Sequence, residues 1–175
     1  MPQAAPSIDL ANVKAERVQL VDARNRPCGS APRRTMRRLS CWHRATYVFV
    51  RDSRGALCVQ QRTPTKEVYP GYHDLAAGGV VGAGEAVHVS ARRELAEELG
   101  VEGARLRWCL DFVFRDAANR VHGSVFLTDY DGPLRLQAEE VAGAEWLAPD
   151  AALALETSTP DSRRALELLR QRGFL

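Results

Sequence analysis

Three closely spaced glutamates near the middle of the chain are the residues best suited to do chemistry. Glu94, Glu97 and Glu98 lie at positions i, i+3 and i+4 of a run that reads as a helix over 85–99. At about 100° per residue, the three side chains share one helix face. Carboxylates this close repel one another and favour a bound cation, and their oxygens suit magnesium or manganese. The triplet alone is more typical of a solvated helix face.

The wider pattern is more specific than the triplet. Leucines beside the acidic face supply an apolar stripe that docks the helix on a core, which leaves the acids at the edge of a cleft. Glu85 lies at the helix start, where the positive end of the helix dipole favours a carboxylate. Arg93 borders the acids and can orient them by ion pairing. The fixed positions are Gly79, Glu85, Arg93, Glu94, Leu95, Glu97, Glu98, Gly100 and Val101.

This spacing over 79–101 resembles the Nudix box, with every position of the pattern present. The resemblance implies an α/β/α sandwich around a mixed sheet, with the box as a loop-helix-loop. It implies that Glu97 and Glu98 are metal ligands, that Glu94 is a ligand or a base for the attacking water, and that Gly79 offers its carbonyl. It also implies that Glu85 and Arg93 fix the geometry. The expected cofactor is Mg²⁺, with Mn²⁺ as a substitute.

The elements that must position these residues are read from periodicity and turn residues. The pattern predicts a mixed α/β sandwich with two hairpins, 44–51 with 56–62 and 106–115 with 121–128. Alternation places Leu106, Trp108, Leu110, Phe112 and Phe114 on one face of their strand. Further strands are predicted at 16–23 and 144–147, helices at 31–39, 85–99 and 160–170, and a helical turn at 149–155.

The length of 175 residues predicts a single domain over 1–175. Within it, 1–14 are expected to be flexible and 16–42 to form an N-terminal strand and turn extension. A net charge of +2 gives no reason to expect a nucleic-acid partner. The sequence has no signal peptide, no long apolar run and no paired cysteines, so we expect a cytoplasmic protein without a membrane partner. The sequence leaves the oligomeric state open, and symmetry statistics alone favour a homodimer.

Residues outside the box are expected to complete the site. The resemblance implies a second acid from Glu139 or Glu140, with Glu140 favoured. Arg44, Arg62 and Lys66 flank the first hairpin and the loop leading to the box, so we expect them to bind substrate phosphate. The arginines within 33–38 are interpreted as surface charge, with phosphate binding as the alternative.

The predicted function is hydrolysis of a diphosphate linkage in a nucleotide-like small molecule by water attack at phosphorus. The stretches 43–50, 60–66 and 69–74 also resemble a Nudix branch close to isopentenyl-diphosphate isomerase, which makes an isomerase the main rival. That chemistry uses a cysteine opposite a glutamate, whereas the strand entering the box carries Ala76 and Ala77. A non-catalytic nucleotide-sensing module is the third hypothesis. The sequence does not identify the substrate.

Overall fold

The computed structural model describes residues 16–175, and its strands form one mixed sheet of eight strands. The strands are β1 (Arg17–Val21), β2 (Pro27–Pro32), β3 (His43–Arg51), β4 (Leu57–Arg62), β5 (His73–Asp74), β6 (Arg107–Arg115), β7 (Arg120–Asp129) and β8 (Val141–Leu147). The helices are α2 (Arg33–Arg38), α3 (Val87–Leu99), α4 (Pro149–Ala154) and α5 (Pro160–Gln171). Residues 1–14, which we expect to be flexible, lie outside the part of the chain that the structure describes.

Strand β3 lies at the centre and pairs in parallel with β7, from His43 opposite Val121 to Arg51 opposite Asp129. Its side chains alternate between two hydrophobic cores, as the pleat of a strand requires. Tyr47 and Phe49 enter the core that also contains residues of α4 and α5. Val48 and Val50 enter the core that contains the apolar face of α3. Both faces of the sheet are therefore buried.

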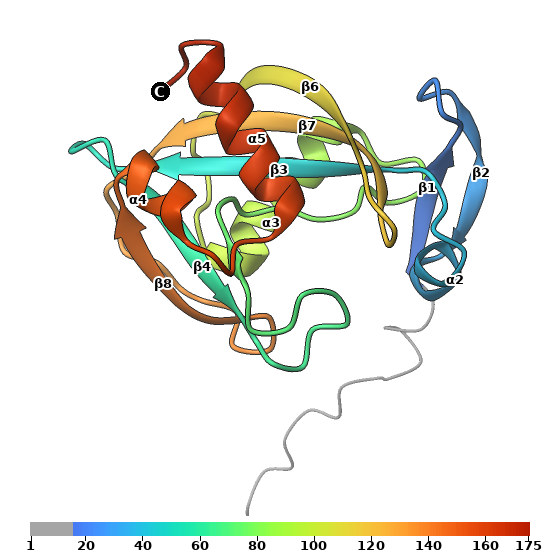
Figure 1. Ribbon diagram of the computed structural model, residues 1–175, viewed down its shortest axis with the longest axis horizontal. Coiled ribbons are helices and arrows are strands. Elements are labelled where there is room, and N and C mark those ends of the chain that lie inside the picture. Colours follow the sequence, from blue (N-terminus) through green and yellow to red (C-terminus); the bar gives the residue numbers. More distant parts are fainter. Residues whose placement is uncertain (1–15) are drawn as a thin grey trace, which may run out of the picture.

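The helices cover the sheet from both sides: α4 and α5 lie on one face and α3 lies behind the other (Figure 1). This arrangement confirms the expected α/β/α sandwich with a mixed sheet. Helix α3 ends where its sequence predicts, because Gly100 adopts the left-handed conformation at φ 67° and its N–H bonds the Ala96 carbonyl.

The predicted hairpin of 44–51 with 56–62 is wrong except at its turn. Strands β3 and β4 pair only at Arg51 opposite Leu57, and β4 then diverges to pair with β8 and β5. The chain that enters the box fills the space beside β3, with isolated bridges from Val48 to Ala77 and from Ala45 to Val80. The opening of the sheet at this point is what brings the box alongside β3.

The prediction that the five alternating apolar residues of β6 share one face is also wrong. The β6–β7 register shifts between Trp108 and Leu110, so the strict two-residue alternation is broken there. Leu110 and Phe112 enter the α5-side core, whereas Trp108 is exposed. Strands β2 and β5 were not predicted, because β2 is a short run with glycine and proline and β5 has only two residues.

The N-terminal extension packs against the box loop. The β1–β2 hairpin leads into α2, whose buried Met36 forms a small apolar cluster with Val18 and Val80. Because Val80 follows Gly79 directly, this cluster fixes α2 beside the start of the box.

Gly78 is the position where the box loop approaches β3 most closely. Its φ is 153°, and an added Cβ would overlap the Thr46 carbonyl oxygen. We expect Gly78→Ala to lower the free energy of unfolding by about 3 kcal/mol through strain and displaced backbone. The control Gly55→Ala shares a positive φ (84°) but meets no atom within 4 Å, so about 1 kcal/mol is expected. Urea unfolding measures both, and equal losses would contradict the close approach.

Candidate active site

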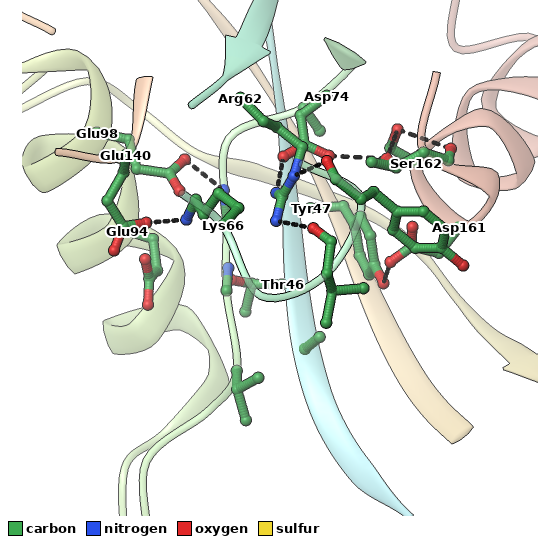
Figure 2. Close-up of a pocket in the computed structure, with 18 of the residues that line it drawn as sticks. Thr46, Tyr47, Arg62, Lys66, Asp74, Glu94, Glu98, Glu140, Asp161 and Ser162 are labelled. Atoms are coloured by element: carbon green, nitrogen blue, oxygen red, sulfur yellow. Dashed lines mark hydrogen bonds and ion pairs between the residues drawn. The ribbon is translucent and has the colours of Figure 1, made fainter. Parts of the chain in front are cut away.

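A cavity opens on the α5 side of the sheet, next to the divergence of β3 and β4. Figure 2 shows its two ends: Glu94, Glu98 and Glu140 lie with Lys66 at one end, and Tyr47, Asp161 and Ser162 lie at the other. Arg62 and Asp74 lie between them. The lining therefore comes from α2, α3, α5, β3, β4 and β5, together with the box loop and the loops that follow β4 and precede β8.

Two of the three box glutamates are buried at the first of these ends. Glu94 is 8% exposed and Glu98 is 6% exposed. The Oε2 atom of Glu98 accepts hydrogen bonds from the Gln60 amide at 3.2 Å and the Gly78 N–H at 3.1 Å. Burial, followed by the nearby charge of Glu94, raises the pKa of Glu98 to about 8. Burial likewise raises the pKa of Glu94.

Gly79 leaves room for the Glu94 carboxylate. A Cβ at position 79 would lie 2.6 Å from Oε1 of Glu94, so any other residue would push that carboxylate away. The Gly79 carbonyl accepts the Thr46 N–H at 2.9 Å. Since a carbonyl oxygen has two lone pairs, this one can accept a second contact.

Arg93 connects three glutamates of the box. Its guanidinium contacts Glu85 at 2.8 Å, Glu94 at 2.9 Å and Glu97 at 3.1 Å. Glu85 in turn accepts the Gly82 N–H at 2.9 Å. The helix begins at Val87, so Glu85 precedes its first turn and ties the loop to the helix through Arg93. These contacts raise the pKa of Arg93 and lower that of Glu85.

The remaining predicted acids lie at different depths. Glu97 lines the rim of the cavity, with its side chain 49% exposed. Glu140 lines the cavity and forms an ion pair with Lys66. Glu139 lies outside this cavity and offers its backbone carbonyl to Thr63. The structure therefore brings Glu140, rather than Glu139, to the same cavity as the box glutamates.

These acids do not form a closed set of ligands. Within residues 16–175, no group of three or more histidine, cysteine, aspartate or glutamate side chains is arranged to hold one metal ion. Arg93 and Lys66 occupy oxygens of Glu94, Glu97 and Glu140, so these pairs must rearrange before the carboxylates converge. The donors themselves fit a hard divalent cation, since two buried carboxylates lie close enough to repel each other and offer oxygen ligands.

Two of the three predicted substrate-binding cations line the cavity. Lys66 pairs with Glu140, and Arg62 forms an ion pair with Asp74 and donates to the carbonyls of Val68 and Tyr69. The structure does not bring Arg44 there, because strand alternation places its side chain on the α3 face of β3. Its guanidinium bonds Asn25 instead, at 2.8 Å to the side-chain oxygen.

The far end of the cavity has polar residues that local sequence patterns did not single out. The Tyr47 hydroxyl donates to Asp161 at 2.7 Å, and the Thr159 hydroxyl donates to Asp74 at 2.7 Å. Burial and the charge of Asp74 raise the pKa of Asp161. Tyr47 lies in the middle of β3, Asp74 ends β5, and Thr159 and Asp161 lie at the start of α5, so no local spacing in the sequence groups them.

Two of the arginines interpreted as surface charge also line the cavity. Arg33 and Arg37 lie one turn apart on α2 and face inward, whereas Arg34 and Arg38 are exposed. His43, at the start of β3, lines the same region and bonds the Cys41 carbonyl at 3.0 Å. The interpretation as solvated charge therefore fails for Arg33 and Arg37, because α2 packs against the box loop.

Comparison with known proteins identifies the class of this fold and site. A sequence model of the NUDIX domain matches residues 42–169. The chain therefore belongs to the Nudix family, which confirms the resemblance drawn from the box.

Individual relatives agree with that assignment. An uncharacterized Nudix hydrolase, PA4841 of Pseudomonas aeruginosa, is 47% identical over 156 residues, covering 89% of this chain and 92% of the relative. The crystal structure of DR0079 from Deinococcus radiodurans has a TM-score of 0.77 at 28% identity, over 87% of this chain and 98% of that one. The NUDIX domain of Shewanella oneidensis NrtR, complexed with ADP ribose, has a TM-score of 0.61 at 16% identity, over 75% and 88%.

None of the helices within residues 16–175 is long and apolar enough to cross a membrane. All four cysteines are free thiols.

His43 provides a test of the cavity's electrostatics. Burial, together with the charges of Arg37 and Arg33, lowers its pKa from 6.5 to about 4. The unfolded chain therefore takes up this proton at a higher pH than the folded chain. We expect the wild type to lose about 3 kcal/mol of its free energy of unfolding as pH falls from about 6.5 to about 4.

The measurement is urea unfolding across this pH range, with His43→Asn as the test variant and His88→Asn as the control on the exposed side of α3. The control should follow the wild type, and His43→Asn should lose less stability in acid. Parallel curves for all three proteins would show that His43 is not the group responsible.

Proposed function

We propose that this Nudix enzyme hydrolyses a diphosphate linkage in a nucleotide-like substrate with the help of Mg²⁺, with Mn²⁺ as a substitute. The observation that carries the proposal is the buried pair Glu94 and Glu98 next to Gly79. Glu94 is paired with Arg93, whereas Glu98 has only hydrogen bonds from Gln60 and the Gly78 N–H, so its negative charge lacks an ion-pair partner among the described residues. A divalent cation supplies such a partner and suits oxygen donors.

The residues that would hold the metal are Glu94, Glu97, Glu98 and Glu140, with the carbonyl of Gly79. When bound, such an ion activates water and neutralises phosphate oxygens. The remaining work falls to the protein's own side chains. Arg93 and Glu85 hold the acids in place. Lys66 and Arg62 line the cavity beside them and can bind substrate phosphate once it displaces their present partners.

A carboxylate within reach of the attacking water can accept its proton. Glu94 and Glu98 both line the cavity, and either can take the proton of the attacking water. The water's oxygen would then form the new bond to phosphorus, and the bridging oxygen would leave with the other phosphate group. Positioning and charge stabilisation account for most of the expected rate enhancement.

The isomerase alternative finds less support in the cavity. Its chemistry needs a cysteine opposite a glutamate, and no cysteine lines the cavity formed by the described residues. Cys58 and Cys109 are instead buried in the two cores, and burial raises the pKa of Cys58 to about 12. A thiol that is buried in a core and does not line the cavity cannot donate a proton to a substrate bound there.

The bound ADP ribose in the NrtR domain indicates one class of ligand that this fold accommodates. ADP ribose is a nucleoside diphosphate linked to a further sugar, which matches the class proposed here. The same observation gives the sensing alternative its test, because a sensing module would bind such a nucleotide without releasing phosphate-containing products.

The direct test compares the wild type with Glu97→Gln and Glu98→Gln on a panel of nucleoside diphosphate derivatives and nucleoside triphosphates in Mg²⁺. Loss of a ligand charge should lower kcat/KM by about 100-fold. Glu102→Gln is the matched control, since Glu102 is exposed beyond the end of α3. Mg²⁺ should also raise the thermal midpoint of the wild type and have little effect on that of Glu98→Gln.

Equal turnover by the wild type and both glutamine variants would refute the metal-site assignment. Tight nucleotide binding without turnover anywhere on the panel would favour the sensing module. Conversion of isopentenyl diphosphate into its isomer would favour the isomerase.

A further inference from the structure

Helix α2 brings two arginines to the cavity from outside the segment that matches the family model, which begins at residue 42. The buried Met36 holds the helix against Val18 and Val80, so the positions of its neighbours are fixed by packing. Arg33 and Arg37 lie at i and i+4, about 6 Å apart along the helix. Both line the cavity.

Arg37 differs from the other cations of the cavity wall. Arg62 pairs with Asp74, Lys66 pairs with Glu140, and Arg33 lies 3.5 Å from Glu16. Within the described residues, Arg37 has no carboxylate within ion-pair distance, and its one side-chain bond is a long 3.3 Å contact to the Asn119 amide oxygen. Burial and the charge of Arg33 lower its pKa, and the charge of Asp161 offsets this only in part.

The two arginines act on different parts of the cavity. Arg33, at the first residue of α2, lines the cavity together with Glu94 and Glu140 and lies 3.5 Å from Glu16. Arg37 bonds the β6–β7 turn, and the groups that influence it include Asp161 and Tyr47 of the far end. A group bound by Arg37 would therefore lie beyond the diphosphate that Arg33 and the α3 acids face.

The acid at the far end does not neutralise Arg37 directly. Asp161 accepts the Tyr47 hydroxyl at 2.7 Å and forms no ion pair with Arg37. Asp74 is already paired with Arg62. What Arg37 lacks is an acceptor of opposite charge, and a planar guanidinium binds phosphate or carboxylate through paired hydrogen bonds.

We propose that Arg37 binds a second anionic group of the substrate, separate from the diphosphate that is hydrolysed. The substrate class is then a nucleotide-like diphosphate that carries an additional phosphate monoester or carboxylate on one of its two moieties. This inference rests on the proposed function and deepens it, because it assigns substrate selection to α2.

The experiment uses two pairs of substrates that differ only in the extra anion. NADP⁺ against NAD⁺ tests a phosphate monoester, and UDP-glucuronic acid against UDP-glucose tests a carboxylate. The wild type should prefer the anionic member of at least one pair by kcat/KM. Arg37→Gln should reduce that preference about tenfold, the size of one charged hydrogen bond, and Arg37→Lys should restore part of it.

Arg38→Gln is the matched control, because Arg38 lies on the same helix, is exposed and does not line the cavity. Urea unfolding of each variant verifies that the fold is retained. A preference for phosphate alone or for carboxylate alone identifies which anion the site takes, and either result supports the proposal.

Three results would overturn the inference and leave the proposed function standing. The first is hydrolysis of both members of each pair at equal kcat/KM. The second is an equal loss on both members in Arg37→Gln. The third is hydrolysis elsewhere on the nucleotide panel with no turnover of either anionic substrate. Absence of hydrolysis across the entire panel would instead refute the proposed function itself.

Discussion

The mutual repulsion of Glu94 and Glu98 is the constraint around which this molecule is built. Two ionisable carboxylates one helical turn apart are both less than a tenth exposed. Arg93 neutralises Glu94 from one side, while Gln60 and the Gly78 N–H support Glu98 from the other. This partial compensation keeps the acids in place, and in the proposed function a cation completes it. The fold thus brings the acids to the cavity, although the ion pairs of Arg93 and Lys66 must still rearrange.

The divergence of β3 and β4 makes that placement feasible. A continuous hairpin would separate α3 from the α5 side of the sheet, since each strand would block the way. Instead β4 turns toward β8, and residues 77–80 lie beside β3. Carboxylates of a helix on one face thereby reach a cavity on the other. Gly78 and Gly79 stand at this crossing because a side chain would meet Thr46 at one position and Glu94 at the next.

Local signals allowed much of this to be predicted, and non-local contacts explain the rest. The box, its helix and the Gly100 end are encoded within about 20 consecutive residues, so spacing alone locates them. The face of the sheet to which Arg44 or Arg62 points depends on how its strand packs between the two cores. The sequence predicts that both bind substrate, but only Arg62 lines the cavity. The bulge at Trp108 and the two-residue strand β5 depend on partners distant in sequence.

The same division separates the two ends of the cavity. The acidic end comes mainly from one loop and one helix, so the chemistry of the box can be carried by a short contiguous segment. The far end combines Arg37 of α2, Tyr47 of β3, Asn119 of the β6–β7 turn and Asp161 of α5, which meet only when the sheet has formed. A substitution at any one of these positions can alter what the far end binds without moving the acids. Under the two proposals made above, reaction and selectivity are set by separate parts of the fold, and for that reason a complete box does not identify the substrate.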